Sequence, residues 1–582
     1  MKKVNPLQLL SEELESEQDS VRVNAVRRLP VVATVMGDTS QAKTQILGFI
    51  DTMLLKEEND EVLYGIAESL TTLSSYFKVK MIYILEKLVS IEESVVRQKA
   101  VCGYVALAKS VGKKELKEVV LPNVKKLSES SSLTTKISAV DVMTDIYPLC
   151  GEEEKKVIRG RFNVLFGEDS LMVRRVLATK LGTLCGYMKK SLVVAELIKS
   201  FKMLSNDDSA KVRIITIDSL VNLAECLSED ENKTHMIPII INLTSDKSWR
   251  VRVHLASRFD DISNAVGADV SDSLVSVFAS LLRDAESLVR LDALKSLSKF
   301  VGNLKNERIS GLISVFKSLS TDPVALVRVS SAELFQAMLK NDSIKDMLKN
   351  KSDVREKIHT IIKTLTQDED MEVKIEAFEV VKLCGTYVPH SEVEELTVSI
   401  YKTLEENTNW RLRNSGIQTL LGLSIIYANQ TLFDQKFKKA FLRGLTDKAE
   451  QVRAMTIDNI PKLSKFLNDN YLMTYVAVEM LTILAETENY NYQQRISAIY
   501  GMKELYFSLK KTDTMDQIVI SQILPLTENG VVNVRMVTLK VLKNINNKTK
   551  NSSLKDQIKK TVARLAAQEK DQETLYLASK FY

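Results

Sequence analysis

Two short segments place an indole ring beside guanidinium groups, a combination that favours protein recognition. Residues 246–252 read DKSWRVR and residues 407–413 read NTNWRLR, and they hold the only two tryptophans, Trp249 and Trp410. Each tryptophan is followed directly by an additional arginine, Arg250 or Arg411. Tryptophan and arginine are enriched among the few residues that carry most of the free energy of a protein–protein contact. The alternative is that each ring only packs over the adjacent turn, and the residues alone do not separate the two interpretations.

Residues suited to catalysis or metal binding are scattered through the sequence. The 4 histidines lie far apart, and the sequence has no HExxH, GxxxxGK[ST] or GxSxG motif. We predict that these histidines lie on helix surfaces. The 5 cysteines show no CxxC spacing, which favours reduced core thiols over metal ligands or disulfides. We therefore predict that the protein is not an enzyme and has no catalytic residue, metal site or cofactor.

A recurring Val-Arg dipeptide indicates which elements carry the two tryptophan segments. Its basic residue returns about every 40 residues, a period typical of HEAT or armadillo repeats. Apolar residues follow the arginine at the spacing of a helix that buries one face. The dipeptide occurs at Val21-Arg22, Val96-Arg97, Val173-Arg174, Val212-Arg213, Val251-Arg252, Val289-Arg290, Val327-Arg328, Val452-Arg453 and Val534-Arg535, with Val373-Lys374, Leu412-Arg413 and Gln494-Arg495 in equivalent positions.

An acidic or amide residue accompanies the dipeptide, six positions before the base. Asp and Asn accept hydrogen bonds from the free N–H groups at a helix start, so this residue predicts a cap on the second helix of each pair. We further expect each arginine to reach the turn of the next repeat and form a ladder of polar contacts. The residues in this position are Asp207, Asp246, Asp284, Asp322, Asp368, Asn407, Asp447, Asn489 and Asn529, preceded by Glu168.

The repeats predict an all-α fold, a curved, horseshoe-like α-solenoid of about fifteen antiparallel helix pairs that runs through residues 1–582 as one array. The interval from Arg328 to Lys374 is longer than the others, which predicts an inserted turn. The approximate repeats are 5–42, 43–80, 81–117, 118–155, 156–194, 195–233, 234–271, 272–309, 310–355, 356–394, 395–432, 433–470, 471–513, 514–553 and 554–582.

Composition limits the classes of partner. The net charge is +5 from 80 basic and 75 acidic residues, and this near balance argues against a nucleic-acid partner. The first residues become polar before a signal peptide could form, and no apolar run is long enough to span a membrane. We expect a soluble protein in the cytoplasm, with the nucleus as a second location.

Several longer segments are similar to those of a known family. The chain resembles the scaffold (A) subunits of protein phosphatase 2A, a family of fifteen HEAT repeats. The resemblance lies in residues 246–267 (DKSWRVRVHLASRFDDISNAVG), 92–101 (EESVVRQKAV), 172–182 (MVRRVLATKLG), 60–70 (DEVLYGIAESL) and 409–413 (NWRLR).

The resemblance implies a non-catalytic scaffold in a hetero-oligomer, a dimer or a trimer. The phosphatase catalytic subunit would bind the turns of the C-terminal repeats, and an exchangeable regulatory B subunit those of the N-terminal and middle repeats. The implied regulatory-subunit contacts are Glu92, Glu93, Asp169, Arg174, Arg175, Trp249 and Arg250. The implied catalytic-subunit contacts are Trp410, Arg411, Arg413, Arg453, Arg495 and Arg535.

The main alternative is a nuclear transport receptor of the importin-β type or another HEAT-repeat adaptor. Such receptors tend to be longer and acidic, whereas this chain is slightly basic. The two interpretations differ in the partner that they predict, a phosphatase subunit or a Ran-type GTPase.

Overall fold

The computed structural model describes residues 6–54, 56–301, 306–406 and 409–581. Every regular element in these residues is a helix, so the prediction of an all-helical solenoid is confirmed. The chain divides into two compact units, Met1–Ser296 and Leu297–Tyr582. No helix of the described residues is both long and apolar enough to cross a membrane.

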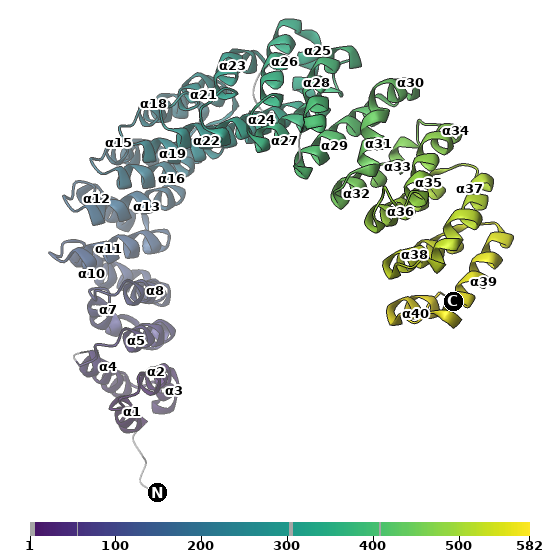
Figure 1. Ribbon diagram of the computed structural model, residues 1–582. Coiled ribbons are helices and arrows are strands. Elements are labelled where there is room, and N and C mark those ends of the chain that lie inside the picture. The colour runs from purple at the N-terminus through teal and green to yellow at the C-terminus, as the bar shows by residue number, and fades with distance from the viewer. Residues whose placement is uncertain (1–5, 55, 302–305, 407–408, 582) are drawn as a thin grey trace. The chain divides into compact units, whose positions relative to one another are not determined.

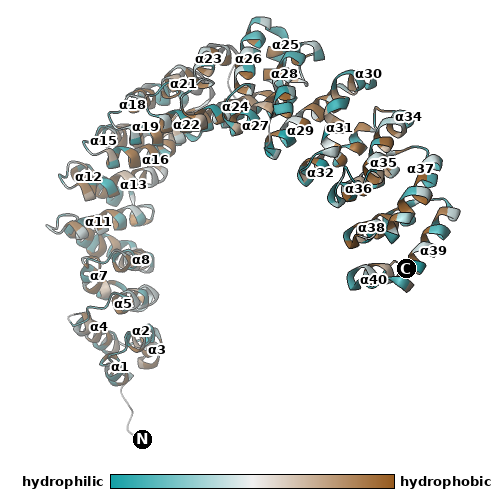
Figure 2. Ribbon diagram, in the orientation of Figure 1, coloured by the Kyte–Doolittle hydropathy of each residue, from teal (hydrophilic) through white to brown (hydrophobic). Residues whose placement is uncertain are grey.

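Within each unit the helices form two rows (Figure 1). The first helix of each pair, the A helix, packs on the A helix of the next pair, and the second, the B helix, packs on the next B helix. Figure 2 shows that apolar and polar residues alternate around the same helices, as expected for helices that bury one face.

In the first unit, the A helices are α1 (Pro6–Leu14), α4 (Ser40–Leu54), α7 (Ile82–Leu88), α10 (Leu121–Ser128), α12 (Glu152–Leu165), α15 (Ile198–Ser205), α18 (Ile237–Thr244) and α21 (Ala268–Leu281). The B helices are α2 (Asp19–Arg27) with α3 (Leu29–Met36), α5 (Asp60–Thr72) with α6 (Ser74–Phe77), α8 (Ser94–Ser110), α11 (Leu133–Ile146), α13 (Leu171–Tyr187), α16 (Ala210–Cys226) and α19 (Trp249–Ser257) with α20 (Phe259–Val266). Helix α22 (Ser287–Phe300) spans the boundary of the two units.

In the second unit, the A helices are α23 (Asn306–Leu319), α25 (Asp342–Asn350) with α26 (Ser352–Thr366), α28 (His390–Glu406), α31 (Lys438–Thr446), α35 (Val478–Ala485), α37 (Asp513–Ile518) and α39 (Ser552–Gln568). The B helices are α24 (Ala325–Lys340), α27 (Met371–Cys384), α29 (Trp410–Tyr427), α32 (Glu450–Asp458) with α33 (Ile460–Leu463), α36 (Tyr492–Ser508), α38 (Val532–Lys548) and α40 (Gln572–Ser579). Short helices that lead into A helices are α9 (Lys113–Glu115), α14 (Lys190–Leu192), α17 (Glu229–Glu231), α30 (Gln430–Leu432) and α34 (Asp469–Tyr471).

The contact between α13 and α16 shows why neighbouring B helices pack closely. The Ser219 hydroxyl donates to the Ala178 carbonyl across the contact at 2.6 Å. One turn later, a Cβ built on Gly182 would lie 2.5 Å from Nδ2 of Asn222. A side chain at Gly182 would therefore displace the Asn222 side chain, whose Cβ would lie 3.2 Å away, and this close approach favours glycine.

Several A helices widen by one residue near their start. A single turn of π-helix precedes the A helix in five of these pairs and follows α37 in the sixth, and in three of them a proline follows the turn by two residues. A π turn leaves a carbonyl without its usual partner, and this makes room for the proline ring. The π turns are Leu116–Val120, Val193–Leu197, Asn232–Met236, Phe433–Phe437, Leu472–Ala477 and Val519–Ile523.

Two predictions about the fold need correction. The long interval before Lys374 holds an additional amphipathic helix, α25, rather than an inserted turn, because Ile344, Met347 and Leu348 bury one of its faces. All five cysteines are free, but they are not all in the core, since Cys102 is exposed.

Candidate protein-binding ridge

The Val-Arg arginines join consecutive helix pairs through the turns that precede the B helices. In the first unit, Arg213 donates from Nε and Nη2 to the carboxylate of Asp246 in the next turn, both at 2.7 Å. Its Nη1 donates to the carbonyls of Asp207 and Asp208 in its own turn, at 2.6 and 3.1 Å. One guanidinium thus binds both its own turn and the next turn, so these turns lie side by side. We call the row of turns that precede the B helices the turn ridge.

The same arrangement recurs in both units and forms the predicted ladder. In each pair, Nε and Nη2 of an arginine bind both oxygens of a carboxylate about one repeat later, the bidentate geometry that arginine favours. The pairs are Arg174–Asp207, Arg213–Asp246 and Arg252–Asp284 in the first unit, and Arg328–Asp368, Arg413–Asp447 and Arg535–Glu569 in the second.

The prediction that the acidic residue caps the B helix is wrong. The residue before α16 is Ser209, and Asp207 lies two positions earlier, where its Oδ1 accepts from the Ser209 N–H at 2.8 Å. Asp246 accepts from the Ser248 N–H in the same way, also at 2.8 Å. Each carboxylate therefore shapes the turn and receives the arginine of the preceding repeat. Asn407, predicted in the same position, lies outside the described residues.

The ion pairs raise the pKa values of their arginines. The hydrogen bond that Arg213 donates to Asp246 is the largest cause that raises the pKa of Arg213. At the last pair, the hydrogen bond from Arg535 lowers the pKa of Glu569 to about 2. Sequence reasoning missed Glu569 because the helix that follows it, residues 572–579, holds no basic residue to mark the equivalent position.

Among the described residues, the ladder is interrupted at Arg97, Arg453 and Arg495, which form no ion pair with the next turn. Arg97 donates to the carbonyls of Ile91 and Glu92 in its own turn, and the next turn carries Ser130 where the carboxylate would stand. Arg453 is 1% exposed, its Nε donates to Ser497 at 2.9 Å, and its Nη2 has no acceptor in the described part of the chain. Burial is the largest cause that lowers the pKa of Arg453.

The third interruption concerns Arg495. Among the described residues its side chain has no hydrogen-bond or ion-pair partner, and its Nε is buried. The turn after it has Asn529 in the carboxylate position, where the side-chain oxygen accepts from the Val531 N–H at 3.0 Å like the other turn residues. The turn geometry is therefore preserved, and only the charge is missing.

The two tryptophans are the first residues of B helices rather than residues of the preceding turns. Trp249 begins α19 and is half-buried, and the Arg250 guanidinium lies 4.5 Å from the centre of its ring, which is a cation–π contact. Trp410 begins α29 and is 42% exposed. The neighbouring Arg411 donates to both oxygens of Glu372, the equivalent position of the preceding turn, at 2.6 and 3.1 Å.

The structure separates the other predicted contact residues into two groups. Glu92, Asp169 and Arg250 are exposed on the turn ridge, and Arg175 is half-buried with an Nε that has no partner in the described residues. The residues of the second group have structural roles. Glu93 caps α8, Arg453 is buried, and the ladder includes Arg174, Arg413 and Arg535. Because 1% exposure leaves no surface for a partner, the prediction that Arg453 is a contact residue needs correction.

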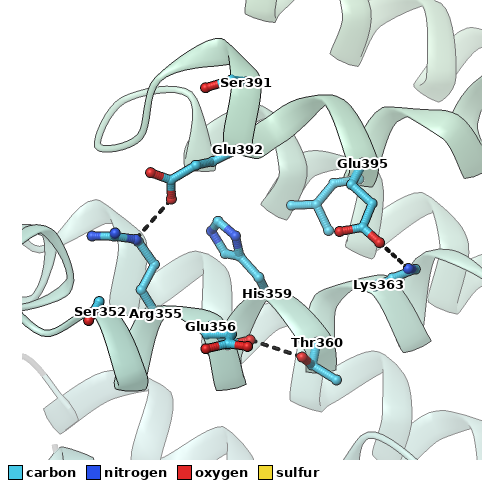
Figure 3. A pocket seen from close by; sticks show the side chains of 10 residues that line it. Ser352, Arg355, Glu356, His359, Thr360, Lys363, Ser391, Glu392 and Glu395 are labelled. Carbon is cyan, nitrogen blue, oxygen red and sulfur yellow. Dashed lines mark hydrogen bonds and ion pairs between the residues drawn. The ribbon is translucent and has the colours of Figure 1, made fainter.

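A furrow between α26 and α28 brings several titratable groups together (Figure 3). It has a volume of about 470 Å³, and Arg355 pairs with Glu392 at 2.9 Å while Lys363 pairs with Glu395. His359 lies between them on α26 and is half-buried, and burial lowers its pKa. No group of three or more potential metal ligands occurs in the described part of the chain.

Comparisons with known proteins point in one direction. The chain is 29% identical over 269 residues to the A-type regulatory subunit of protein phosphatase PP2A from Schizosaccharomyces pombe, a match that covers 45% of each chain. It is 31% identical over 202 residues to the protein phosphatase 2A scaffold subunit of Dictyostelium discoideum, which covers 34% of each. This chain is similar to the scaffold subunits of protein phosphatase 2A. The resemblance inferred from the sequence is thereby confirmed, and the matched segments span less than half of these relatives.

Two further matches concern parts of the chain or its fold. Residues 188–350 match the family model described as the PIK3R4-like middle domain. A crystal structure of importin beta superposes with a TM-score of 0.53 at 13% identity and covers 98% of this chain and 86% of that one. At this identity the likeness concerns the solenoid fold alone.

Proposed function

We propose that this protein is a non-catalytic scaffold of a protein phosphatase 2A-type Ser/Thr phosphatase. In this proposal, the turn ridge of the C-terminal repeats holds the phosphatase catalytic subunit. The turn ridge of the N-terminal and middle repeats holds a regulatory B subunit, and the complex is a hetero-dimer or trimer. The similarity to relatives named as scaffold subunits carries the proposal.

The geometry of the turn ridge supports this assignment. A tryptophan with an adjacent arginine begins one B helix in each compact unit, so each unit has an exposed or half-exposed aromatic anchor. The ladder holds the turns around these tryptophans in place, so less conformational entropy is lost when a partner binds. A scaffold that binds two proteins also raises their effective concentration toward one another.

Trp410→Ala with Arg411→Ala tests the catalytic-subunit surface. Both side chains lie at the surface, so truncation removes a contact without opening the core. We expect the variant to lose a purified phosphatase 2A catalytic subunit in a pull-down and to retain the regulatory subunit. Tyr83→Ala, which removes an exposed aromatic from the A helix α7, serves as the matched control. Normal recovery of the catalytic subunit by the double variant would refute the assignment.

Trp249→Ala with Arg250→Ala tests the regulatory-subunit surface in the same assay. The expected result is selective loss of the regulatory subunit, because the cation–π pair is removed as a unit. If every regulatory subunit still binds, this pair has only the structural role of covering its turn.

The transport alternative makes a different prediction. A receptor of the importin-β type would bind a Ran-type GTPase in its GTP state, and we expect no such binding by this chain.

We also propose a cytoplasmic location, with the nucleus as a second one, which imaging of the tagged protein would test. The pure chain should have no phosphatase activity in a standard assay.

A further inference from the structure

A second surface is formed by lysines at the turns on the other edge of the C-terminal helix pairs. These turns connect each B helix to the following A helix, after α33, α36 and α38. All six lysines are exposed, and we call them the lysine ridge. They are Lys462, Lys465, Lys510, Lys511, Lys548 and Lys550.

Direct contacts place these three turns next to one another. The backbone N–H groups of Lys510 and Lys511 donate to Oδ2 of Asp469, at the start of α34, at 3.0 and 3.1 Å. Lys548 lies 4.4 Å from the ring centre of Phe507, at the end of α36. The lysines of the ridge therefore lie on three consecutive turns that contact one another.

The lysine ridge brings unneutralised charges together on three consecutive repeats. Some exposed lysines elsewhere reach an acid one repeat away, as Lys87 reaches Asp51 at 2.5 Å and Lys439 reaches Glu405 at 2.9 Å. Among the described residues, none of the six ridge lysines forms an ion pair. Lys462 donates only to the amide oxygen of Asn459, at 3.3 Å.

Like charges at this spacing act together. Packed helices lie about 8–10 Å apart, and the Debye length at physiological ionic strength is about 8 Å. Neighbouring lysine pairs therefore repel one another and attract an anion jointly. The acids in these turns are Asp469, whose Oδ2 already accepts two backbone N–H groups, and Asp513, so the positive charge dominates.

We propose that the lysine ridge binds an extended acidic peptide segment of a partner protein. An extended chain advances about 3.3 Å per residue, so carboxylates at about every third residue would meet lysine pairs on successive repeats. Lysine suits this role because its compact charge on a flexible stem requires no fixed geometry of the acceptor.

The composition of the turns disfavours other polyanions. The described residues of these turns include none of the exposed large apolar side chains that would insert into a lipid surface. They also present no arginine and no exposed aromatic ring on which a base could stack. A peptide backbone with regularly spaced carboxylates requires neither feature.

The test uses the full chain and a fluorescent nine-residue peptide with glutamate at every third position, separated by glycine and serine. We expect binding in an anisotropy titration that weakens with salt, and no binding of the peptide with glutamine in place of glutamate. Lys510→Gln with Lys511→Gln should weaken binding about tenfold, the effect of two exposed ion pairs near the upper end of their usual strength. Lys510→Arg with Lys511→Arg should retain it.

The matched control is Lys113→Gln with Lys114→Gln, an exposed adjacent pair at an equivalent turn in the first unit. This variant should bind the peptide as the unmodified chain does. An equal loss in both glutamine variants, or no loss in either, would overturn the proposal. So would tighter binding to phosphatidylserine vesicles or to oligouridylate that depends on Lys510 and Lys511, because the ridge would then belong to a membrane or an RNA.

Discussion

Replacing Arg213 with methionine should destabilise the array more than any substitution at an exposed turn. The Arg213 side chain is 4% exposed and that of Asp246 is 8% exposed, which makes this the most buried pair of the ladder. Methionine keeps much of the apolar stem but leaves the Asp246 carboxylate buried without its partner. Breaking a buried ion pair on one side costs about 3–5 kcal/mol.

Arg97→Met provides the matched control. Arg97 also donates to two carbonyls of its own turn, but the next turn offers it Ser130 instead of a carboxylate. Loss of these neutral-acceptor hydrogen bonds should cost about 1–2 kcal/mol. The difference between the two variants isolates the contribution of the carboxylate.

Urea denaturation followed by circular dichroism gives the free energies, and hydrogen exchange shows where the change occurs. Because each helix pair contacts only its neighbours, lost protection should be confined to the pairs that Arg213 joins. A double-mutant cycle with Asp246→Asn should give a coupling of at least about 1 kcal/mol. If Arg213→Met costs no more than Arg97→Met, or if the coupling is near zero, the ladder does not stabilise the array.

Three further predictions follow from individual sites. Asn529→Asp should place a carboxylate beside the unpaired Arg495 and stabilise the protein by about 1 kcal/mol, whereas an unchanged urea midpoint would contradict this geometry. Burial lowers the pKa of His359 below 6.5, so stability should fall as the pH decreases from about 6.5 to the folded-state pKa and level off below it; His359→Gln should remove this slope. Gly182→Val should cost about 1–3 kcal/mol through the clash between B helices, and Gly186→Val, where nothing lies within 4 Å of the added Cβ, should cost less in the same denaturation assay.

The helical solenoid could be predicted from the sequence because its signal is repeated many times. Each Val-Arg dipeptide marks the first turns of a B helix, and the apolar residues that follow define one buried face. The ladder could also be anticipated, since an arginine that recurs with an acid about one repeat later suggests a contact between repeats. The role of the acid could not, because a helix cap and a turn hydrogen bond both require a short carboxylate near a free N–H group.

The candidate contact residues were harder to predict because sequence spacing does not report exposure. Arg453 and Arg252 hold equivalent positions near the starts of their helices, yet the first is buried and the second is half-buried. The difference depends on what the next repeat offers, such as Ser497 for Arg453. The additional helix α25 could not be predicted for a similar reason. Its many polar residues are typical of a turn, whereas the structure shows that Ile344 and Leu348 are buried.

The scaffold assignment is tested most directly by purifying the tagged full chain from its own cells and identifying the bound proteins by mass spectrometry. We expect at least one regulatory subunit to co-purify with the chain, together with a phosphatase 2A-type catalytic subunit. We also expect Trp410→Ala with Arg411→Ala to deplete only the catalytic subunit. Recovery of a Ran-type GTPase with transport cargo, and of neither phosphatase subunit, would contradict the scaffold assignment.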